Sequence, residues 1–403
     1  LRFQEATWPH NVGHVRAHQL KRLQVLYSAE HTAFVYLPAV EAQLPWGHVF
    51  GCGPASREME LVLTDVHYPG PLQGVAWHTV GGVDGIFVAS RAVLDLGQDL
   101  DKVESKFDKQ AERAEEFFGA RADLDGGGEE ESYAAAPAEQ RYAIRTYISA
   151  NMGVSWQPLA APAQDSGPWS TGCPSASSSQ RDDESDGGDQ PGRSCSLHLA
   201  EVVSSAAAPG VVLGVGNAGV RLADNPQHHS LFASRDAGLS WKHVLIGRHT
   251  VAILSHGDAF VAVSVGSPGT VRYVVDGGAG GPWKTTEVRE LHGRGDVALQ
   301  GLFTHPSHTD ARAFIALGSE ATSKVTLTVL DLGPALGESC ALPEAPGRPG
   351  SDFERWSPAD ALEDAHESKR PACLLGTRTT YVRRKVQVGR ACRTVVKPGW
   401  EGA

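Results

Sequence analysis

An eight-residue pattern that ends in tryptophan occurs twice and restricts the fold more than any other feature. It reads Ser-x-Asp-x-Gly-x-x-Trp at 234–241 and Ser-x-Asn-x-Gly-x-x-Trp at 149–156. A short Asp or Asn side chain accepts hydrogen bonds from backbone N–H groups two residues on, and glycine supplies the positive φ of a tight turn. The tryptophan begins the next strand and buries its ring against a neighbouring sheet. Each copy therefore predicts the tip of a β-hairpin.

A third, degenerate copy has a longer loop between its glycine and its tryptophan. All three are expected to shape hairpins rather than to bind a ligand, because each residue type has an explanation in turn geometry or packing. The residues with this predicted structural role are Ser149, Asn151, Gly153, Trp156, Ser234, Asp236, Gly238, Trp241, Asp276, Gly278 and Trp283.

Short apolar strands recur between these turns. One type has Phe-Val at or near its centre, and a second type follows it after a loop. Glycine (45 residues) and proline (24) are abundant, and long helical periodicity is scarce, so we expect an all-β fold of repeated small sheets, as in a β-propeller. The expected strands are Thr32–Tyr36, Asp84–Ala89 and Asp258–Ala262 for the first type, and Glu60–Thr64, Arg145–Ser149 and Val271–Val275 for the second.

Two segments interrupt the strand pattern. Residues 98–119 predict an amphipathic helix inside a surface insertion over 95–140, and 174–193 form a Ser-rich, acidic loop that predicts a second surface insertion. From residue 335 the chain turns Gly/Pro-rich and charged around three cysteines. We place a domain boundary there, between residues 1–334 and 335–403.

Charge and hydropathy exclude several classes of protein. The formal net charge is −11 and no stripe of Lys and Arg runs through aromatic residues, so nucleic acid is not an expected partner. No apolar run approaches the roughly 20 residues that cross a bilayer. The chain starts at Leu1 without a signal-peptide pattern, and we expect it to be a piece of a longer protein.

Two motifs that suggest chemistry fail on their context, and a third does not occur. The Gly-x-Gly-x-x-Gly string at 214–219 is followed by no helix before Pro226, so no dinucleotide cofactor is predicted. His10, His14 and His18 have zinc-ligand spacing only on a helix, and this segment is expected to be extended, so no metal is predicted. No Gly-x-Ser-x-Gly elbow occurs, so no catalytic residue is assigned.

The Trp-ended pattern resembles the Asp-box of several propeller families, including sialidases and sortilin-type receptors. The segments around it, in their order along residues 20–395, resemble the sortilin family. Those segments are Met59–Val66, Gly82–Val88, Cys195–Leu199, Ala208–Gly219, His249–Val263, Asp352–Trp356, Cys373–Gly376 and Tyr381–Lys385.

The resemblance implies a fold and a function. The fold would be the C-terminal blades of a large ten-bladed propeller over 1–334, then the start of a cysteine-rich module. The function would be luminal capture of peptide or proprotein cargo by a type I transmembrane sorting receptor, without catalysis or cofactor, in the Golgi, trans-Golgi network and endosomes or on the way to the vacuole. The membrane anchor, and the tail that meets cytosolic adaptors, would lie outside this chain. No ligand-contacting residue carries over by motif.

The alternative is a sialidase-like glycoside hydrolase on an Asp-box propeller. Such an enzyme places an arginine cluster at the propeller centre, and no Arg-rich opening occurs here. The 17 histidines suggest a further hypothesis for the receptor, release of cargo in acid.

Six cysteines without a Cys-x-x-Cys pair favour disulfides over a zinc site. The family resemblance implies a Cys173–Cys195 bridge at the base of the acidic loop and a Cys340–Cys392 bridge in the module. Cys373 would then pair with a cysteine outside this chain, although the module pairing is open from sequence alone. Cys52 is expected to be a buried free thiol.

Overall fold

The computed structural model describes residues 23–29, 32–39, 45–53, 58–70, 73–94, 142–162, 170–171, 195–265, 267–275, 282–288, 298–304, 313–319, 325–335, 340–341, 345–360 and 378–385. The chain divides into two compact units, residues 1–91 with 144–403, and residues 92–143. Both predicted insertions, 95–140 and 174–193, and the helix predicted at 98–119 lie outside the described residues.

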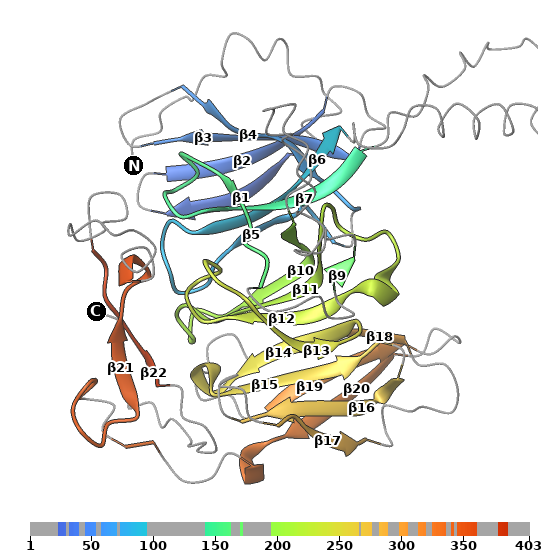
Figure 1. The fold of residues 1–403 in the computed structure, drawn as a ribbon, viewed down its shortest axis with the longest axis vertical. Helices are drawn as coiled ribbons and strands as arrows, with labels where there is room; N and C mark the ends of the chain where they lie inside the picture. The colour runs from blue at the N-terminus through green and yellow to red at the C-terminus, as the bar shows by residue number, and fades with distance from the viewer. Residues whose placement is uncertain are drawn as a thin grey trace, which may run out of the picture. The chain divides into compact units, whose positions relative to one another are not determined.

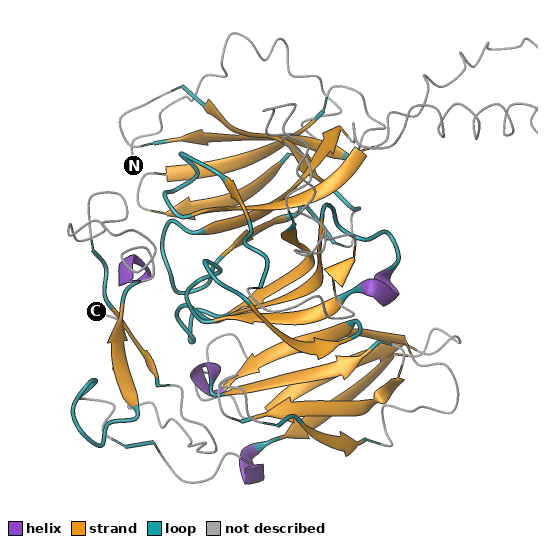
Figure 2. Cartoon of the chain, in the orientation of Figure 1, coloured by secondary structure: helices purple, strands orange, loops and turns teal. Residues whose placement is uncertain are grey.

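The described strands form successive antiparallel groups, here called blades A to E (Figures 1 and 2). Blade A contains β1 (Gln24–Ala29), β2 (Thr32–Pro38), β3 (Trp46–Cys52) and β4 (Glu60–His67). Blade B contains β5 (Trp77–Thr79), β6 (Phe87–Leu94), β7 (Tyr142–Ser149) and β8 (Gln157–Pro158). The described pairing between β4 and β6 is the single pair Val66–Arg91, which joins these two blades into one sheet.

Three further blades follow along the chain. Blade C contains β9 (Ser170–Thr171), β10 (Ser196–Ser204), β11 (Val212–Gly219), β12 (Ser230–Ser234) and β13 (Lys242–Ile246). Blade D contains β14 (His249–Leu254), β15 (Ala259–Ser264), β16 (Ser267–Val274) and β17 (Lys284–Glu287). Blade E contains β18 (Ala298–Phe303), β19 (Ala313–Ser319) and β20 (Val325–Asp331).

Short elements complete the described fold. Three 3-10 turns lie at Pro226–His228, Ser255–Gly257 and Gly333–Ala335. A separate two-stranded hairpin, β21 (Phe353–Trp356) with β22 (Tyr381–Arg384), follows the predicted boundary at 335. That boundary stays a prediction.

Burial along the strands explains why they form blades. Every residue of β11 is buried, whereas all four residues of β17 are exposed. A strand buried on both faces needs a neighbouring sheet on each side, and a polar outer strand faces water. The polar β17 therefore forms the outer edge of its blade, and the apolar β11 lies inside the packed sheets.

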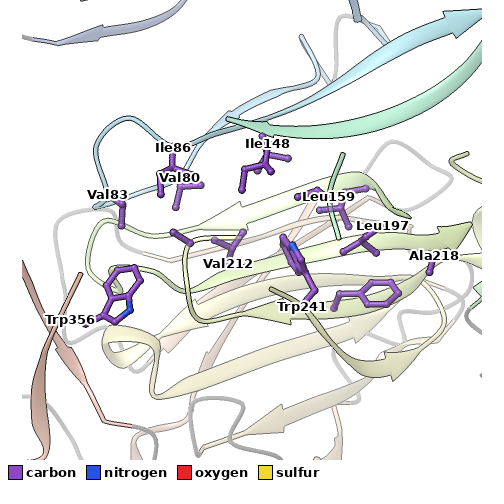
Figure 3. Close-up of a cluster of buried hydrophobic side chains, with 14 residues drawn as sticks. Val80, Val83, Ile86, Ile148, Leu159, Leu197, Val212, Ala218, Trp241 and Trp356 are labelled. Carbon is purple, nitrogen blue, oxygen red and sulfur yellow. The ribbon is translucent and has the colours of Figure 1, made fainter. Parts of the chain in front are cut away.

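Apolar clusters fill the spaces between consecutive blades. One cluster joins blades B and C through Val80, Ile148, Leu197 and Trp241 (Figure 3). Similar clusters join A to B, C to D and D to E. Small, mainly antiparallel sheets that pack one on the next in chain order are the arrangement of a partial β-propeller, so the predicted all-β propeller fold is confirmed, while the disulfide-rich module stays a prediction.

Most expected strands are present, with one difference in their place. Arg145–Ser149 and Val271–Val275 belong to β7 and β16, the third strands of blades B and D. Glu60–Thr64 belongs to β4, the fourth strand of blade A, because β3 intervenes. In blade A the strand that corresponds to β7 and β16 is therefore β3, and not the predicted Glu60–Thr64.

The glycine string at 214–219 lies within β11 rather than at a helix. A Cβ added to Gly216 would lie 1.9 Å from the carbonyl oxygen of His198 on the adjacent strand β10. Gly214 and Gly216 therefore permit close packing within the sheet.

Candidate functional site

The turn at 234–241 is closed by its own side chains. The Ser234 hydroxyl donates to Asp236 Oδ1 at 2.7 Å and accepts from the Gly238 N–H at 2.8 Å. Asp236 Oδ1 also accepts from the Ser240 N–H at 2.8 Å. The Trp241 indole N–H donates to the Gly238 carbonyl at 2.8 Å, which places the ring at the start of β13. Each residue that defines the pattern thus has a bond or a packing position in the turn.

The turn at 149–156 has the same geometry with asparagine in place of aspartate. The Ser149 hydroxyl donates to Asn151 Oδ1 at 3.0 Å and accepts from the Gly153 N–H at 2.9 Å. Asn151 Oδ1 accepts from the Ser155 N–H at 2.9 Å, and the Trp156 indole donates to the Gly153 carbonyl at 3.1 Å. The amide oxygen therefore accepts the same bonds as the carboxylate oxygen, while the second bond reverses: the Ser240 hydroxyl donates to Asp236 Oδ2, whereas Asn151 Nδ2 donates to the Ser155 hydroxyl.

The third copy lies only partly within the described residues. Asp276 and Gly278 lie outside them, while Trp283 is partly buried against the cluster between blades C and D. The tryptophan packing expected from the sequence is therefore present at this copy, and its turn stays a prediction.

The two described Trp-ended turns, 149–156 and 234–241, are called boxes below. Each box also bonds to the turn that joins two earlier strands of the same blade, β5–β6 in blade B and β10–β11 in blade C. The Met152 N–H donates to the Gly85 carbonyl at 2.9 Å, and the Ala237 N–H donates to the Gly210 carbonyl at 2.9 Å. Met152 and Ala237 both have positive φ, 56° and 64°. Because the two bonds join corresponding positions, the two boxes lie at the same end of blades B and C.

Polar side chains connect blade B to blade C at this end. His78 Nε2 lies 2.7 Å from the Ser204 hydroxyl oxygen, which also accepts from the Gly81 N–H at 2.8 Å. Burial lowers the pKa of His78 to about 4. The His78 ring is therefore neutral near pH 7 and serves as a hydrogen-bonding group between two blades.

A second buried histidine connects the same two blades further inside. The Thr146 N–H on β7 donates to His198 Nδ1 at 3.2 Å, and His198 Nε2 lies 3.1 Å from the Gly219 carbonyl. Since Nδ1 accepts and the carbonyl needs a donor, the ring is neutral with its proton on Nε2. Burial lowers the pKa of His198 to about 4, despite the opposing hydrogen bond to Gly219.

The β21–β22 hairpin docks on the box end of blades B, C and D. The Trp356 ring packs so closely on Gly210 that a Cβ there would lie 2.6 Å from the Trp356 ring atom Cη2. The Asp84 N–H donates to the Tyr381 hydroxyl at 3.2 Å. Arg384 lies 3.4 Å from Asp258 in a buried ion pair.

Arg235, which occupies the variable position between Ser234 and Asp236, is part of this contact. Its guanidinium donates to the Arg384 carbonyl at 3.1 Å. Burial and the neighbouring Arg383 guanidinium lower the pKa of Arg235 to about 10, so it stays charged near pH 7. This docking role has no local signal in the sequence, because any residue type fits the position between Ser234 and Asp236 in the pattern.

Two of the four cysteines with a predicted partner lie within the described residues. Cys195 and Cys340 are both disulfide-bonded. Their predicted partners, Cys173 and Cys392, lie outside the described residues, as does Cys373. The pairings and the disulfide-rich module therefore stay predictions.

Cys52 is a free thiol at the end of β3. It is half-buried and packs against an apolar cluster of blade A that includes Phe50 and Met59. The expected free thiol is present, with partial rather than full burial.

Metal-binding and membrane-spanning features were also sought among the described residues. They contain no group of three or more His, Cys, Asp or Glu placed to hold a metal ion. They also contain no helix with the length and hydropathy needed to cross a bilayer. His10, His14 and His18 lie outside this part of the chain.

Two family models match the chain, one after the other. The model described as sortilin, neurotensin receptor 3 (Sortilin-Vps10) matches residues 130–294, and the model of its C-terminal region (Sortilin_C) matches residues 304–396. The first match covers both described boxes and blade D, and the second covers β19, β20 and the β21–β22 hairpin.

Curated relatives agree with these matches. The chain is 28% identical over 254 residues to the vacuolar protein sorting/targeting protein 10 of Aspergillus clavatus, and 30% identical over 254 residues to that of Aspergillus fumigatus. Each alignment covers 60% of this chain and 15% of the relative. The aligned part of the chain thus spans only a small part of these relatives.

Solved structures give weaker similarities. A solved structure from an analysis of two prolyl endopeptidases matches with a TM-score of 0.36 and 11% identity, over 90% of this chain and 38% of that chain. An α-L-arabinofuranosidase from Fusarium graminearum in complex with an iminosugar inhibitor matches with a TM-score of 0.23 and 12% identity, over 80% and 96%. Neither likeness bears on function. The two consecutive family matches and the fungal relatives show that the chain belongs to the sortilin (Vps10) family.

Proposed function

We propose that this chain is part of the luminal cargo-binding region of a type I transmembrane sorting receptor. In this function it captures peptides or proproteins for transport between the Golgi, the endosomes and the vacuole. The observation that carries the proposal is the match of both sortilin family models, in chain order, to the blades and to the hairpin docked on them. The fungal relatives, whose name is vacuolar protein sorting/targeting protein 10, support the same role.

The sheet edges support capture of an extended segment. A peptide can add a strand to an exposed sheet edge, where main-chain hydrogen bonds provide affinity and side-chain pockets provide selectivity. Within blade C the chain itself makes a short strand addition, because β9 pairs in parallel with Ala218 and Gly219 at the end of β11, beyond the part of β11 that pairs with β12. We therefore expect cargo to bind by strand addition.

Disruption of the parent gene in the source cell tests the proposal. Without the receptor, vacuolar hydrolase precursors would be secreted, and wild-type gene would restore their retention. The measurement is immunoblotting of medium and cell fractions for one vacuolar hydrolase and its precursor. Unchanged retention and processing of a panel of vacuolar hydrolases in the disruptant would contradict the assignment.

The alternative function, a sialidase-like glycoside hydrolase, needs arginines that face a substrate. The buried arginines of the docked hairpin instead contact protein groups: Arg384 pairs with Asp258, and Arg383 pairs with Glu354 at 2.8 Å. The family matches also favour the receptor. A fluorogenic sialoside assay separates the two functions, and turnover by the purified chain would favour the hydrolase.

The remaining parts of the receptor are proposed from the family. A membrane anchor and a tail for cytosolic adaptors would belong to the longer protein, and this chain would lie on the luminal side of the Golgi, the trans-Golgi network and the endosomes. Protease protection of this segment in sealed Golgi and endosomal vesicles measures that orientation.

A further inference from the structure

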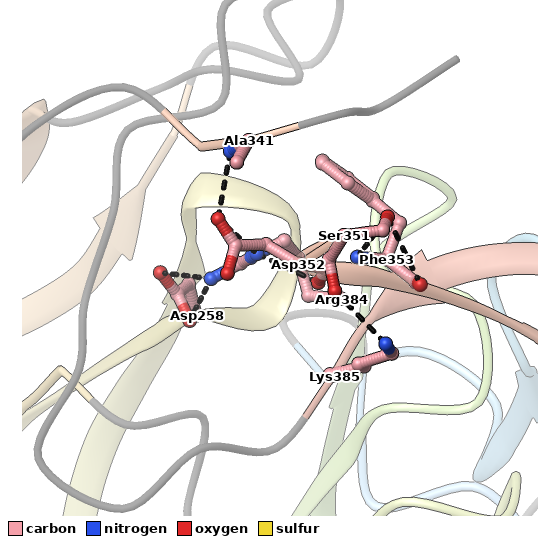
Figure 4. A network of polar contacts seen from close by, with 7 residues as sticks. All are labelled: Asp258, Ala341, Ser351, Asp352, Phe353, Arg384 and Lys385. Atoms are coloured by element: carbon pink, nitrogen blue, oxygen red, sulfur yellow. Dashed lines mark hydrogen bonds and ion pairs between the residues drawn. The ribbon is translucent and has the colours of Figure 1, made fainter. Parts of the chain in front are cut away.

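The β21–β22 hairpin is joined to blade D by buried charge. Arg384, the last residue of β22, is 1% exposed, and its Nη2 lies 3.4 Å from both carboxylate oxygens of Asp258 (Figure 4). Arg384 Nη1 donates to the Asp352 carbonyl at 2.7 Å and lies 4.0 Å from Asp352 Oδ2. The Asp352 carboxylate in turn accepts from the Ala341 N–H at 2.7 Å. The guanidinium is thus held between a carboxylate of the hairpin segment and a carboxylate of the blade.

Two more arginines join the same hairpin to blade C. Arg235 donates to the Arg384 carbonyl at 3.1 Å, and Arg383 donates back to the Arg235 carbonyl. The Arg383 guanidinium also donates to Glu354 at 2.8 Å and lies 4.3 Å from the centroid of the Trp356 ring. This cluster contains three guanidiniums and three carboxylates, which balance in charge: Arg235, Arg383, Arg384, Asp258, Asp352 and Glu354.

The hairpin is too small to be stable by itself. Each strand has four residues, and an isolated two-stranded hairpin is marginally stable at best in water. Its position therefore depends on its contacts with the blades. Since removal of one partner from a buried ion pair leaves an uncompensated charge, those contacts are sensitive to a single charge.

We propose that the β21–β22 hairpin is a clasp, an element that opens separately and fixes the ends of blades B, C and D when the Asp258–Arg384 pair is formed. The clasp reaches blade B through Tyr381 and Asp84, blade C through Arg235, and blade D through Asp258. Regions of low local stability open as cooperative units before the whole protein unfolds. The clasp is such a unit. Its Trp356 ring belongs to the apolar cluster between blades B and C and leaves that cluster on opening, while the cluster members that the blades contribute stay packed on one another.

Hydrogen exchange of the full 403-residue chain, followed by mass spectrometry, tests this. The Asp258→Asn variant keeps the shape of the side chain and removes its charge. Amides of 353–356 and 381–384 are expected to exchange about a hundredfold faster or more in this variant. Amides of β2 and β3 in blade A are expected to exchange at the wild-type rate.

A matched control lies in the same segment. Asp360 pairs with Arg378 at 2.5 Å, but both side chains are 41% exposed. Exposed pairs contribute little, so Asp360→Asn is expected to change clasp exchange by no more than about fivefold. An equal effect of the two variants would overturn the proposal, as would wild-type exchange rates throughout Asp258→Asn.

Equal acceleration in blade A and in the hairpin would also overturn it, because the hairpin would then be part of one cooperative fold. If Asp258→Asn fails to fold, hydrogen exchange of the wild-type chain tests the proposal instead. In low denaturant, the amides of β21 and β22 are expected to share one opening free energy below that of β11 and β15. Exchange of the hairpin only together with β11 and β15 would contradict a separate clasp.

Discussion

Single side chains close the turns that define the blades, and the two described boxes serve as controls for each other. Asp236 and Asn151 accept the same backbone N–H bond through a side-chain oxygen. The oxygen, rather than the negative charge, is therefore the group that the turn needs. Arg235 is separable from the turn, because the first box has Ala150 at that position and still closes.

We expect Asp236→Asn to change the free energy of unfolding by no more than about 0.5 kcal/mol, and Asp236→Ala to lower it by about 1–2 kcal/mol. The alanine variant leaves the Ser240 N–H and the Ser234 hydroxyl without their acceptor. Urea unfolding of the two variants measures the difference. Equal destabilisation by both would show that the charge matters.

A second prediction concerns the glycine of β11 that touches β10. Gly216→Ala is expected to lower the free energy of unfolding by about 2–3 kcal/mol, since the added methyl would overlap the His198 carbonyl. Gly53→Ala is the control, because nothing lies within 4 Å of a Cβ at that position. Thermal unfolding compares them, and a Gly216→Ala variant as stable as Gly53→Ala would contradict the close packing.

Between blades B and C, neutral histidines form hydrogen bonds that apolar side chains could not form. His198 accepts from the Thr146 N–H of β7, and His78 meets Ser204 of β10. Protonation of His198 Nδ1 would place a second N–H against the Thr146 N–H. Acid is therefore expected to destabilise the interface between blades B and C.

The pH dependence of stability follows from this. The pKa of His198 is lowered from 6.5 to about 4 in the folded chain, so the unfolded chain binds the proton first as pH falls. The stability present above pH 6.5 is lost progressively down to about pH 4, by about 1 kcal/mol between pH 7 and about pH 5.5. Urea unfolding across this range measures the loss. His198→Gln is expected to reduce the pH slope, and an unchanged slope in this variant would contradict the assignment.

The turns and most strands were predictable because their signals are local. The bonds of Ser149 and Ser234 lie within four residues of each, so the spacing alone indicates the turn. The docking of the hairpin was not predictable, because Asp258 and Arg384 are 126 residues apart and neither stands out in its own segment. The place of β4 was missed for a related reason, since a strand's neighbours are decided by pairing rather than by its own residues.

For the molecule as a whole, the outer face of blade E differs from the faces between blades. Val325, Leu327 and Val329 alternate along β20 and are 63%, 67% and 68% exposed, with Phe303 and Ile315 also exposed on the neighbouring strands. In the other blades, apolar faces of this kind pack on the next sheet. An uncovered apolar sheet face promotes association in water.

We therefore expect the isolated chain to self-associate as its concentration rises, and Leu327→Lys to reduce this association without lowering stability. Leu327 is exposed, so a charged side chain there replaces no core contact. Sedimentation velocity at increasing concentrations measures the effect, with Thr285→Lys on the polar strand β17 as control. A chain that stays monomeric at every concentration would contradict the expectation.

The one-sided attachment of the β21–β22 hairpin has a consequence for how the blades can separate. Among the described residues, the hairpin meets three of them at the end where the boxes lie, through Asp84, Arg235 and Asp258. Spreading at that end must break the charged contacts between the hairpin and the blades. We therefore expect blades B, C and D to separate less readily at the end that carries the arginine cluster than their apolar contacts alone would allow.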